Sequence, residues 1–239
     1  MPTTTKIKGI ILKISDTPGK DKLLHILTDS AYITAFMTPK RSAGKKSYTV
    51  DIFTYGEFVL YVTDKGNNLV NAVTPIEYFY GLRNDISRLS VSGYFAELAK
   101  YVSSDADCDY SCLMRLFLKA IRLLSDGVNF KLVKPVFEFK AAQLLGFTPC
   151  LEAEKKAGTY YFDLEDGRLY TTAKTGGIML PRSTVYSIYK ILSSDPDSAF
   201  SFMPQDDAQA DAMYSVAQQY ILYHTERDFS SLKFLNGVI

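Results

Sequence analysis

The sequence predicts an α+β protein in which a five-stranded N-terminal barrel is followed by an α-helical domain that carries a β-hairpin. Two observations lead to this fold class. Apolar residues come in short β-branched and aromatic runs up to about residue 80, and afterwards they recur at helical spacing. The length of 239 residues and the 47% hydrophobic content suit two modest folded domains. We therefore expect domains at residues 1–80 and 81–239, with the hairpin inserted at about residues 147–180.

Five runs rich in Ile, Val, Tyr and Phe predict the strands of the N-terminal domain. They are Ile7–Ile14, Lys22–Thr28, Tyr32–Met37, Tyr55–Val62 and Leu69–Ile76. The breaks between them contain Asp, Pro, Gly and Asn and are too short for crossover helices, so the sheet should be largely antiparallel. Five short strands suit a small closed barrel better than a sandwich of seven or more strands. An oligonucleotide-binding (OB-type) barrel is the leading interpretation.

Helical spacing begins after Gly81. Three successive helices are predicted by apolar faces made of Val91, Phe95, Leu98 and Val102, then Leu113, Leu116, Phe117, Ala120 and Leu124, then Val133, Val136, Phe137, Ala141 and Leu144. Gly146 is the expected C-cap of the third. Two further helices should begin near Pro181 and Ala208. Each is too short to be stable alone, so mutual burial must stabilise them as one bundle.

The alternating pattern returns once between the helices. Tyr160–Tyr170 contains two alternating runs around Asp166-Gly167, a dipeptide typical of a type I′ turn. The segment predicts a β-hairpin inserted into the helical domain.

The charge distribution directs attention to one loop. The net charge is +1, but residues 1–80 carry ten basic and seven acidic groups (+3), whereas residues 81–239 carry seventeen and nineteen (−2). Four cations of the N-terminal part stand between two predicted strands: Lys40, Arg41, Lys45 and Lys46. Such a loop is usually a solvated turn, but on an OB-type barrel it favours contact with a phosphodiester backbone.

Further residues extend this candidate DNA-binding site. The cations Lys8, Lys13, Lys20 and Lys22 lie on the first two strands or the turn between them. Tyr48 follows the basic loop, and Tyr32, Phe36 and Tyr55 are further candidate platforms for base stacking, although aromatic residues at alternating strand positions more often belong to the core.

Enzyme and metal signatures are not found. Gly44-Lys45-Lys46 lacks the Ser or Thr of a phosphate loop, and general acid–base chemistry would have to use His25 or His224, neither of which has a placed partner. Acidic pairs near residues 195–197 and 206–207 suit loops and helix caps better than a nuclease site. Cys108 and Cys112 offer two zinc ligands where four are needed. We expect a protein that is not an enzyme, with no cofactor and no metal.

The three cysteines fit a reducing cytosol, and the first residues lack the apolar core of a signal peptide. No run approaches the length needed to span a bilayer. The expected protein is soluble and cytoplasmic, with no membrane partner.

Several segments, in order along nearly the whole chain, resemble the RecO family of recombination mediators. In the N-terminal part these are Lys8-Gly-Ile-Ile-Leu12, Asp21-Lys-Leu-Leu24, the basic loop of residues 40–47 and Gly56-Glu-Phe58. In the C-terminal part they are Gly81-Leu-Arg-Asn-Asp85, Phe137-Glu-Phe139, Leu144-Leu-Gly-Phe-Thr-Pro149, Tyr223-His-Thr-Glu-Arg227 and Ser230-Ser-Leu-Lys-Phe-Leu235.

The resemblance implies a DNA repair and recombination mediator of the RecF pathway, located in the cytoplasm at the nucleoid. It implies binding of single- and double-stranded DNA by the OB-type domain, annealing of complementary strands, and loading of recombinase onto coated single strands. The implied partners are RecR and single-stranded DNA-binding protein (SSB). For the acidic, apolar-ended SSB tail, a groove rimmed by Arg115, Lys119, Arg122 and Lys134 is the expected receptor.

Two points of the sequence limit what is transferred from the family. Many relatives carry a four-cysteine zinc ribbon after the segment matching Leu144–Pro149, whereas Cys150 stands alone here, so we expect a metal-free ribbon in which Tyr160, Phe162 and Tyr170 pack in place of the metal. The near-neutral charge also leaves open an alternative function, that of a protein-interaction adaptor whose barrel does not bind DNA.

Overall fold

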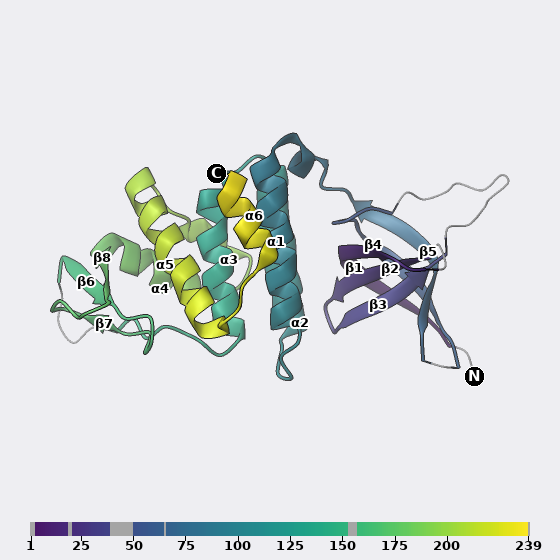
Figure 1. Cartoon of the computed structure of the whole chain (residues 1–239), viewed down its shortest axis with the longest axis horizontal. Helices are drawn as coiled ribbons and strands as arrows, with labels where there is room; N and C mark the ends of the chain where they lie inside the picture. The colour runs from purple at the N-terminus through teal and green to yellow at the C-terminus, as the bar shows by residue number, and fades with distance from the viewer. Residues whose placement is uncertain (1–2, 19–20, 39–49, 65, 153–156, 239) are drawn as a thin grey trace. The chain divides into compact units, whose positions relative to one another are not determined.

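The computed structural model describes residues 3–18, 21–38, 50–64, 66–152 and 157–238 (Figure 1). The chain divides into two compact units, one comprising Met1–Tyr80 with Asp109–Met114 and the other Gly81–Cys108 with Arg115–Ile239. The predicted α+β class is confirmed: the described residues form five N-terminal strands, six α-helices and three further strands.

The five N-terminal strands close into a barrel in the order β1-β2-β3-β5-β4. Their bounds are β1 Thr3–Asp16, β2 Lys22–Thr28, β3 Tyr32–Met37, β4 Tyr55–Val62 and β5 Asn68–Glu77. The predicted ranges of β2, β3 and β4 are confirmed to the residue, while β1 and β5 are longer than predicted. All pairs are antiparallel except β3 and β5, which are parallel and close the barrel.

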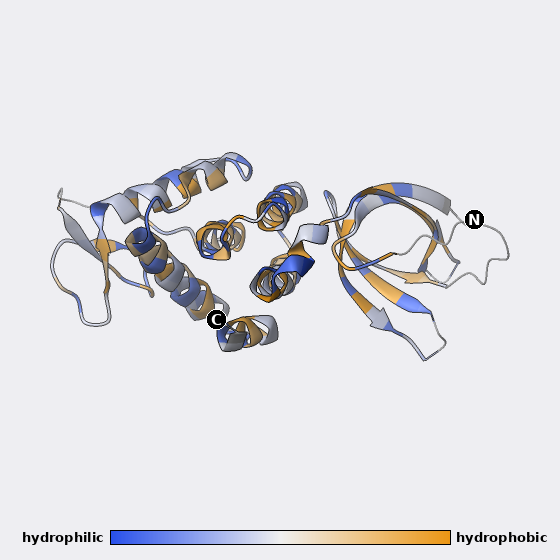
Figure 2. Ribbon diagram, turned by 90° about the horizontal axis from the view of Figure 1, so that it is seen from above, coloured by the Kyte–Doolittle hydropathy of each residue, from blue (hydrophilic) through white to orange (hydrophobic). Residues whose placement is uncertain are grey.

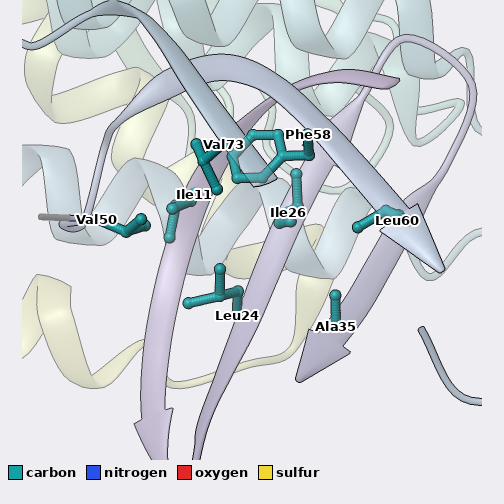
Figure 3. Packing of buried hydrophobic residues seen from close by; sticks show 8 residues of the cluster. All are labelled: Ile11, Leu24, Ile26, Ala35, Val50, Phe58, Leu60 and Val73. Atoms are coloured by element: carbon teal, nitrogen blue, oxygen red, sulfur yellow. The ribbon is translucent and has the colours of Figure 1, made fainter. Parts of the chain in front are cut away.

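The barrel core is formed by the inward side chains of all five strands. Figure 3 shows seven of them, together with Val50 from the segment before β4, pointing toward one another: Ile11, Leu24, Ile26, Ala35, Phe58, Leu60 and Val73. The first strand is long enough to pair with β2 at one end and with β4 at the other. Where it pairs with β4, Gly9 lies opposite Gly56, and a Cβ on Gly56 would come within 2.8 Å of the Thr74 carbonyl oxygen. These two positions therefore require glycine for the strands to approach closely.

The second unit is a helical bundle. Its helices are α1 Ile86–Val102, α2 Tyr110–Ser125, α3 Phe130–Leu144, α4 Arg182–Ser193, α5 Asp207–Thr225 and α6 Ser230–Val238, with short 3₁₀ turns at Tyr80–Asn84 and Ser198–Phe202. All residues of the three predicted apolar faces are buried except Leu144, which is half-buried. The helices predicted near Pro181 and Ala208 are α4 and α5, and Gly146 adopts the left-handed conformation (φ +83°) expected after α3.

Helix α3 is the centre of this bundle, because α1, α4 and α5 all pack against it. Every residue from Val133 to Ala142 is buried, including Lys134, Glu138 and Lys140. Figure 2 shows hydrophobic and hydrophilic segments along each helix, as expected where apolar stripes pack together. The Lys140 ammonium donates to the Leu192 carbonyl at 3.2 Å and thereby caps the C-terminal end of α4.

The predicted hairpin is present as part of a three-stranded sheet with the order β7-β6-β8. The strands are β6 Thr159–Phe162, β7 Leu169–Tyr170 and β8 Ile178–Pro181. The third strand was not predicted. The turn is also not type I′: the Asp163 carboxylate accepts the N–H groups of Glu165 and Asp166, which opens a longer loop. Gly167 takes the left-handed conformation there (φ +64°).

One face of this small sheet is buried and the other is not. Tyr160 and Phe162 are buried as predicted, with Leu169 and Leu180 beside them. The prediction for Tyr170 is wrong, because the period of two places Leu169 on the buried face and Tyr170 on the opposite one.

Helix α6 has no counterpart among the predicted elements. It packs against α1, and the Glu97 carboxylate of α1 accepts the backbone N–H groups of Ser230 at 3.2 Å and Ser231 at 2.9 Å. A side chain 133 residues earlier in the chain therefore supplies the N-terminal cap of α6.

Candidate nucleic-acid interface

The outer face of β1, β2 and β3 combines a cation with aromatic rings. In the strand register, Lys13 lies opposite His25 and His25 lies opposite Thr34, while Leu23 lies opposite Phe36. Their sequence neighbours Leu24 and Ala35 point into the barrel core, so alternation directs this set outward. Lys13 and Thr34 are exposed, and the others are half-buried. We call this surface, made of Lys13, Leu23, His25, Tyr32, Thr34 and Phe36, the outer β1–β3 face.

A β-bulge determines the direction of Lys13. Ile11 belongs to the core, and in a regular strand Lys13, two residues later, would point the same way. The register shifts between these two residues, so that Lys13 pairs with His25 and is exposed, and Ile14 packs inward instead. The bulge therefore adds a positive charge to the outer β1–β3 face.

The rings of His25 and Tyr32 are fixed by a direct contact. The Tyr32 hydroxyl lies 3.0 Å from His25 Nδ1, and the ring centroids are 6.0 Å apart. Burial raises the pKa of Tyr32 to about 12, so this hydroxyl stays protonated at neutral pH. The contact holds two planar rings side by side on β2 and β3.

An apolar row continues from this face around the barrel. Phe36 of β3 lies opposite Leu69 of β5, and Leu69 lies opposite Tyr61 of β4. Leu69 and Tyr61 are 37% and 38% exposed, which is unusual for large apolar side chains standing next to one another. Together with Leu23, these residues form a row of outward side chains across four strands, the apolar row.

The predicted DNA-binding cations lie partly on the described barrel. Lys8 is exposed in the part of β1 that pairs with β4, and Lys22 is half-buried at the start of β2, opposite Met37. The remaining predicted residues lie outside the described residues: Lys20, Lys40, Arg41, Lys45, Lys46 and Tyr48. Tyr55 is half-buried in β4, opposite Ile10 and Glu77.

The cations predicted for a partner's acidic tail do not form one surface. Arg115 is exposed and pairs with Asp195 and Asp197 at the end of α4, its Nε lying 2.9 Å from Asp197 Oδ2. Lys119 and Arg122 are half-buried on α2. These three remain candidates.

Lys134 cannot belong to that surface. Its side chain has no exposed area, and its ammonium lies 2.9 Å from Glu138 Oε1, 2.9 Å from Gln218 Oε1 and 4.0 Å from the centroid of the Tyr214 ring. The prediction for Lys134 is wrong because α3 is covered on several sides, so even the positions off its apolar face point into the bundle.

Both histidines contact aromatic rings. His25 contacts Tyr32, and His224 of α5 stacks on Phe147 with ring centroids 4.7 Å apart. Burial lowers the pKa of His224. Among residues whose positions are described, no three His, Cys, Asp or Glu side chains gather as metal ligands would.

The outer β1–β3 face was only partly predictable. The sequence predicts Tyr32 and Phe36 as stacking candidates, and their alternation with Ala35 indicates that they point outward. The sequence predicts no binding role for His25. Nothing in the sequence marks the bulge that turns Lys13 outward, because it depends on pairing with β2.

None of the helices in the described part of the chain has the length and apolar character that a membrane crossing requires.

Comparison with known proteins identifies the family. Residues 83–233, well over half of the chain, match the family model described as the C-terminal part of recombination protein O. The chain is 27% identical to the DNA repair protein RecO of Acetivibrio thermocellus over 96% of this chain and 95% of that protein. It is also 27% identical to the protein of the same name from Pelotomaculum thermopropionicum, over 97% and 93% of the two chains. A barrel of five strands, a helical bundle with a small inserted sheet, and these matches over nearly the full length establish that the chain belongs to the RecO family.

Proposed function

We propose that this chain acts in DNA repair and homologous recombination as a mediator that binds DNA through its barrel and catalyses no reaction. The relatives that match nearly its whole length are named DNA repair proteins. The single observation that carries the DNA-binding part is the outer β1–β3 face, where Lys13 lies opposite His25, His25 contacts Tyr32, and Phe36 points outward from the same face.

The strand order supports an OB-type barrel as residues 1–80. A long first strand pairs with both β2 and β4, and β3 runs parallel to β5 where the barrel closes. In OB folds the face of strands 2 and 3, with the loops after strands 1 and 4, binds oligonucleotides. The outer β1–β3 face is the corresponding surface in this chain.

Each residue of the face has a definite task in this proposal. Lys13, with Lys8 and Lys22 on the same two strands, neutralises phosphates and releases the counterions condensed on them. The Phe36 ring and the coupled rings of His25 and Tyr32 provide flat surfaces for unpaired bases. The side chains of Lys20, Lys40, Arg41, Lys45, Lys46 and Tyr48 are proposed to extend the contact to the backbone of single and double strands.

The test is fluorescence anisotropy with a labelled single strand and a labelled duplex over a series of salt concentrations. Replacing Lys40, Arg41, Lys45 and Lys46 by Ala should weaken binding and reduce the slope of log K against log salt by up to about 2.8 for the single strand, since each phosphate contact contributes about 0.7. Lys233→Ala, which removes one exposed cation of α6, is the control. An unchanged slope would refute the electrostatic contact.

The helical domain of residues 81–239 is proposed to supply the protein contacts of the mediator. We infer RecR and SSB as partners, with Arg115, Lys119 and Arg122 as candidate contacts of the SSB tail. The sheet at about residues 147–180 is proposed to be a zinc-ribbon-like insertion that needs no metal, since Phe162 packs on Tyr220 with ring centroids 5.4 Å apart. The proposed location is the cytoplasm, at the nucleoid.

A strand-annealing assay tests the mediator role. Complementary oligonucleotides coated with SSB should anneal faster when the protein is added, and the protein should be retained on an SSB column. The same assay with RecR and recombinase present should show faster recombinase loading. If the protein neither speeds annealing nor is retained on the SSB column, only the second candidate function remains.

That second candidate is a protein-interaction adaptor, and the apolar row favours it. Leu23, Phe36, Leu69 and Tyr61 offer a surface that a protein partner would cover without needing charge. The net charge of +1 gives the whole molecule no attraction for a polyanion. Anisotropy separates the two functions, because the adaptor binds neither single nor double strands at low salt.

A further inference from the structure

Helix α4 presents two tyrosine rings and two cations on its outward side. Tyr186 is 59% exposed and Tyr189 is 51% exposed, whereas Val185 and Ile188 on the opposite side are buried. Arg182, Tyr186 and Lys190 are spaced four residues apart and therefore form one row along the helix, with Tyr189 beside it. We call Arg182, Tyr186, Tyr189 and Lys190 the α4 face.

The chain segment that contains the α4 face differs in charge from the domain as a whole. Residues 167–194 contain four cations and no acidic residue, although residues 81–239 as a whole carry nineteen acidic and seventeen basic groups. One of the four, Lys174, is paired with Asp163 and Asp166. The others, Arg168, Arg182 and Lys190, leave an excess of positive charge in this segment, and two of them, Arg182 and Lys190, are on the same helix as the exposed rings.

The cation and the ring are already associated within the face. The Lys190 ammonium lies 5.4 Å from the centroid of the Tyr186 ring, within the range of a cation–π contact. Such a pair places a positive charge beside a flat ring. One nucleotide carries both a negative phosphate and a flat base, so the pair can contact both parts of it.

From these observations we propose that the α4 face is a second DNA contact, which binds single strands with bases stacked on Tyr186 and Tyr189 and phosphates at Arg182 and Lys190. The inference rests on the proposed function only in that the chain binds DNA. It uses a helix of the other unit, with residues different from those of the barrel.

The composition of the face favours a nucleic acid over an acidic peptide with an apolar end. The exposed positions of α4 are Arg182, Ser183, Tyr186, Tyr189 and Ser193, and none is aliphatic. An apolar peptide end needs a hydrophobic groove in which to bury its side chains. Planar bases need only open ring faces and nearby positive charge.

The chain contains no tryptophan, so one introduced tryptophan reports on one place. In the full-length protein, Tyr186→Trp should lose fluorescence when oligo(dT) is added, because a stacked base quenches the indole. The loss should saturate together with the anisotropy of the labelled strand. Phe234→Trp on α6, at a position that is 57% exposed, is the matched control and should keep its emission.

Binding measurements provide the second readout. Y186A/Y189A should weaken oligo(dT) binding about 25-fold or more, since each of the two lost stacking contacts accounts for about fivefold at the low end. R182A/K190A should reduce the salt slope by about 1.4, since each phosphate contact on a single strand contributes about 0.7. Tyr223→Ala, which removes a 47% exposed ring of α5, should leave both quantities unchanged. Equal urea midpoints establish that the variants are folded.

The outcomes distinguish this inference from the function on which it rests. Unquenched Tyr186→Trp in a protein that still binds oligo(dT) overturns the α4 contact and leaves the barrel proposal intact. Quenching that survives when barrel cations are replaced supports the α4 contact even if the barrel proposal fails. Quenching by an Asp-rich peptide with an apolar end, but not by oligo(dT), overturns the DNA assignment in favour of a protein ligand.

Discussion

Lys134 and Glu138 form an ion pair inside the helical bundle, with 2.9 Å between Nζ and Oε1 and no exposed side-chain area on either residue. The Tyr94 hydroxyl donates to Glu138 Oε1 at 2.8 Å, and Gln218 accepts from Lys134. A buried pair of this kind contributes little net stability compared with apolar residues. Removing one partner, however, leaves the other charge buried without a counter-charge, which is strongly destabilising. The pair therefore belongs to one buried network that joins α1, α3 and α5.

Replacing Lys134 by Met should destabilise the protein by about 3–5 kcal/mol, because the Glu138 carboxylate would be left without its counter-charge. K134M/E138Q should recover most of this loss, since the neutral amide can still accept from Tyr94. Urea unfolding at pH 7 measures both. Equal destabilisation of the single and double variants would contradict this account.

The same variant should depend on pH in a defined direction. Burial raises the pKa of Glu138, and Lys134 opposes this effect by its charge, so the pKa rises further in K134M. Between the unfolded and folded pKa values the folded state holds more protons, so stability increases as the pH falls. The urea midpoint of K134M should rise relative to wild type from pH 8 to pH 5, and that of K134M/E138Q should not.

His224 predicts a pH dependence of the opposite sign. Burial lowers its folded pKa below 6.5, and its Nε2 is buried without a hydrogen-bond partner within the described residues. As the pH falls through 6.5, His224 is protonated in the unfolded state before it is protonated in the folded state. The free energy of unfolding therefore decreases until the pH reaches the folded pKa, and below that pH it no longer changes through this group. His224→Phe keeps the stacking on Phe147 and removes the titration. Urea midpoints at pH 7, 6 and 5 should therefore fall less in this variant, and parallel curves would contradict the prediction.

Gly167 is required by two separate constraints that can be measured separately. Its φ is +64°, and a Cβ there would lie 2.8 Å from the Tyr220 hydroxyl. Gly176 has φ +81° with nothing within 4 Å, so Gly176→Ala measures the backbone term alone, about 1 kcal/mol. Gly167→Ala should cost more than Gly176→Ala in urea unfolding. If contact with the Tyr220 hydroxyl causes the additional destabilisation of Gly167→Ala, then adding Tyr220→Phe should remove that additional destabilisation.

Phe36 and Lys13 should contribute to DNA binding in different ways. Phe36→Ala should weaken binding of a labelled single strand by about 1–3 kcal/mol, with an unchanged salt slope, because a stacking surface is lost. Lys13→Ala should reduce the slope by about 0.7. Ile76→Ala removes another exposed apolar side chain of the barrel, 53% exposed on β5, and is the control. If Phe36→Ala binds the labelled single strand as tightly as the control does, the result would favour a protein partner for the apolar row.

The sequence by itself determined the order and type of most elements. Alternation fixed β2, β3 and β4 to the residue, and helical spacing identified the buried faces of α1, α2 and α3, because both patterns record which side of an element avoids water. Turn-forming glycines such as Gly146 and Gly167 were predictable from the same local chemistry. The basic loop and the family resemblance also needed no coordinates.

The tertiary structure decided what depends on contacts between distant segments. The bulge that turns Lys13 outward requires pairing with β2, and α6 is capped by Glu97 from another helix. Lys134 is on the polar side of α3 by its spacing, yet it is buried because neighbouring helices cover that side as well. A one-dimensional pattern gives the preferred face of each element, but the number of its faces that are covered depends on how many neighbours pack around it.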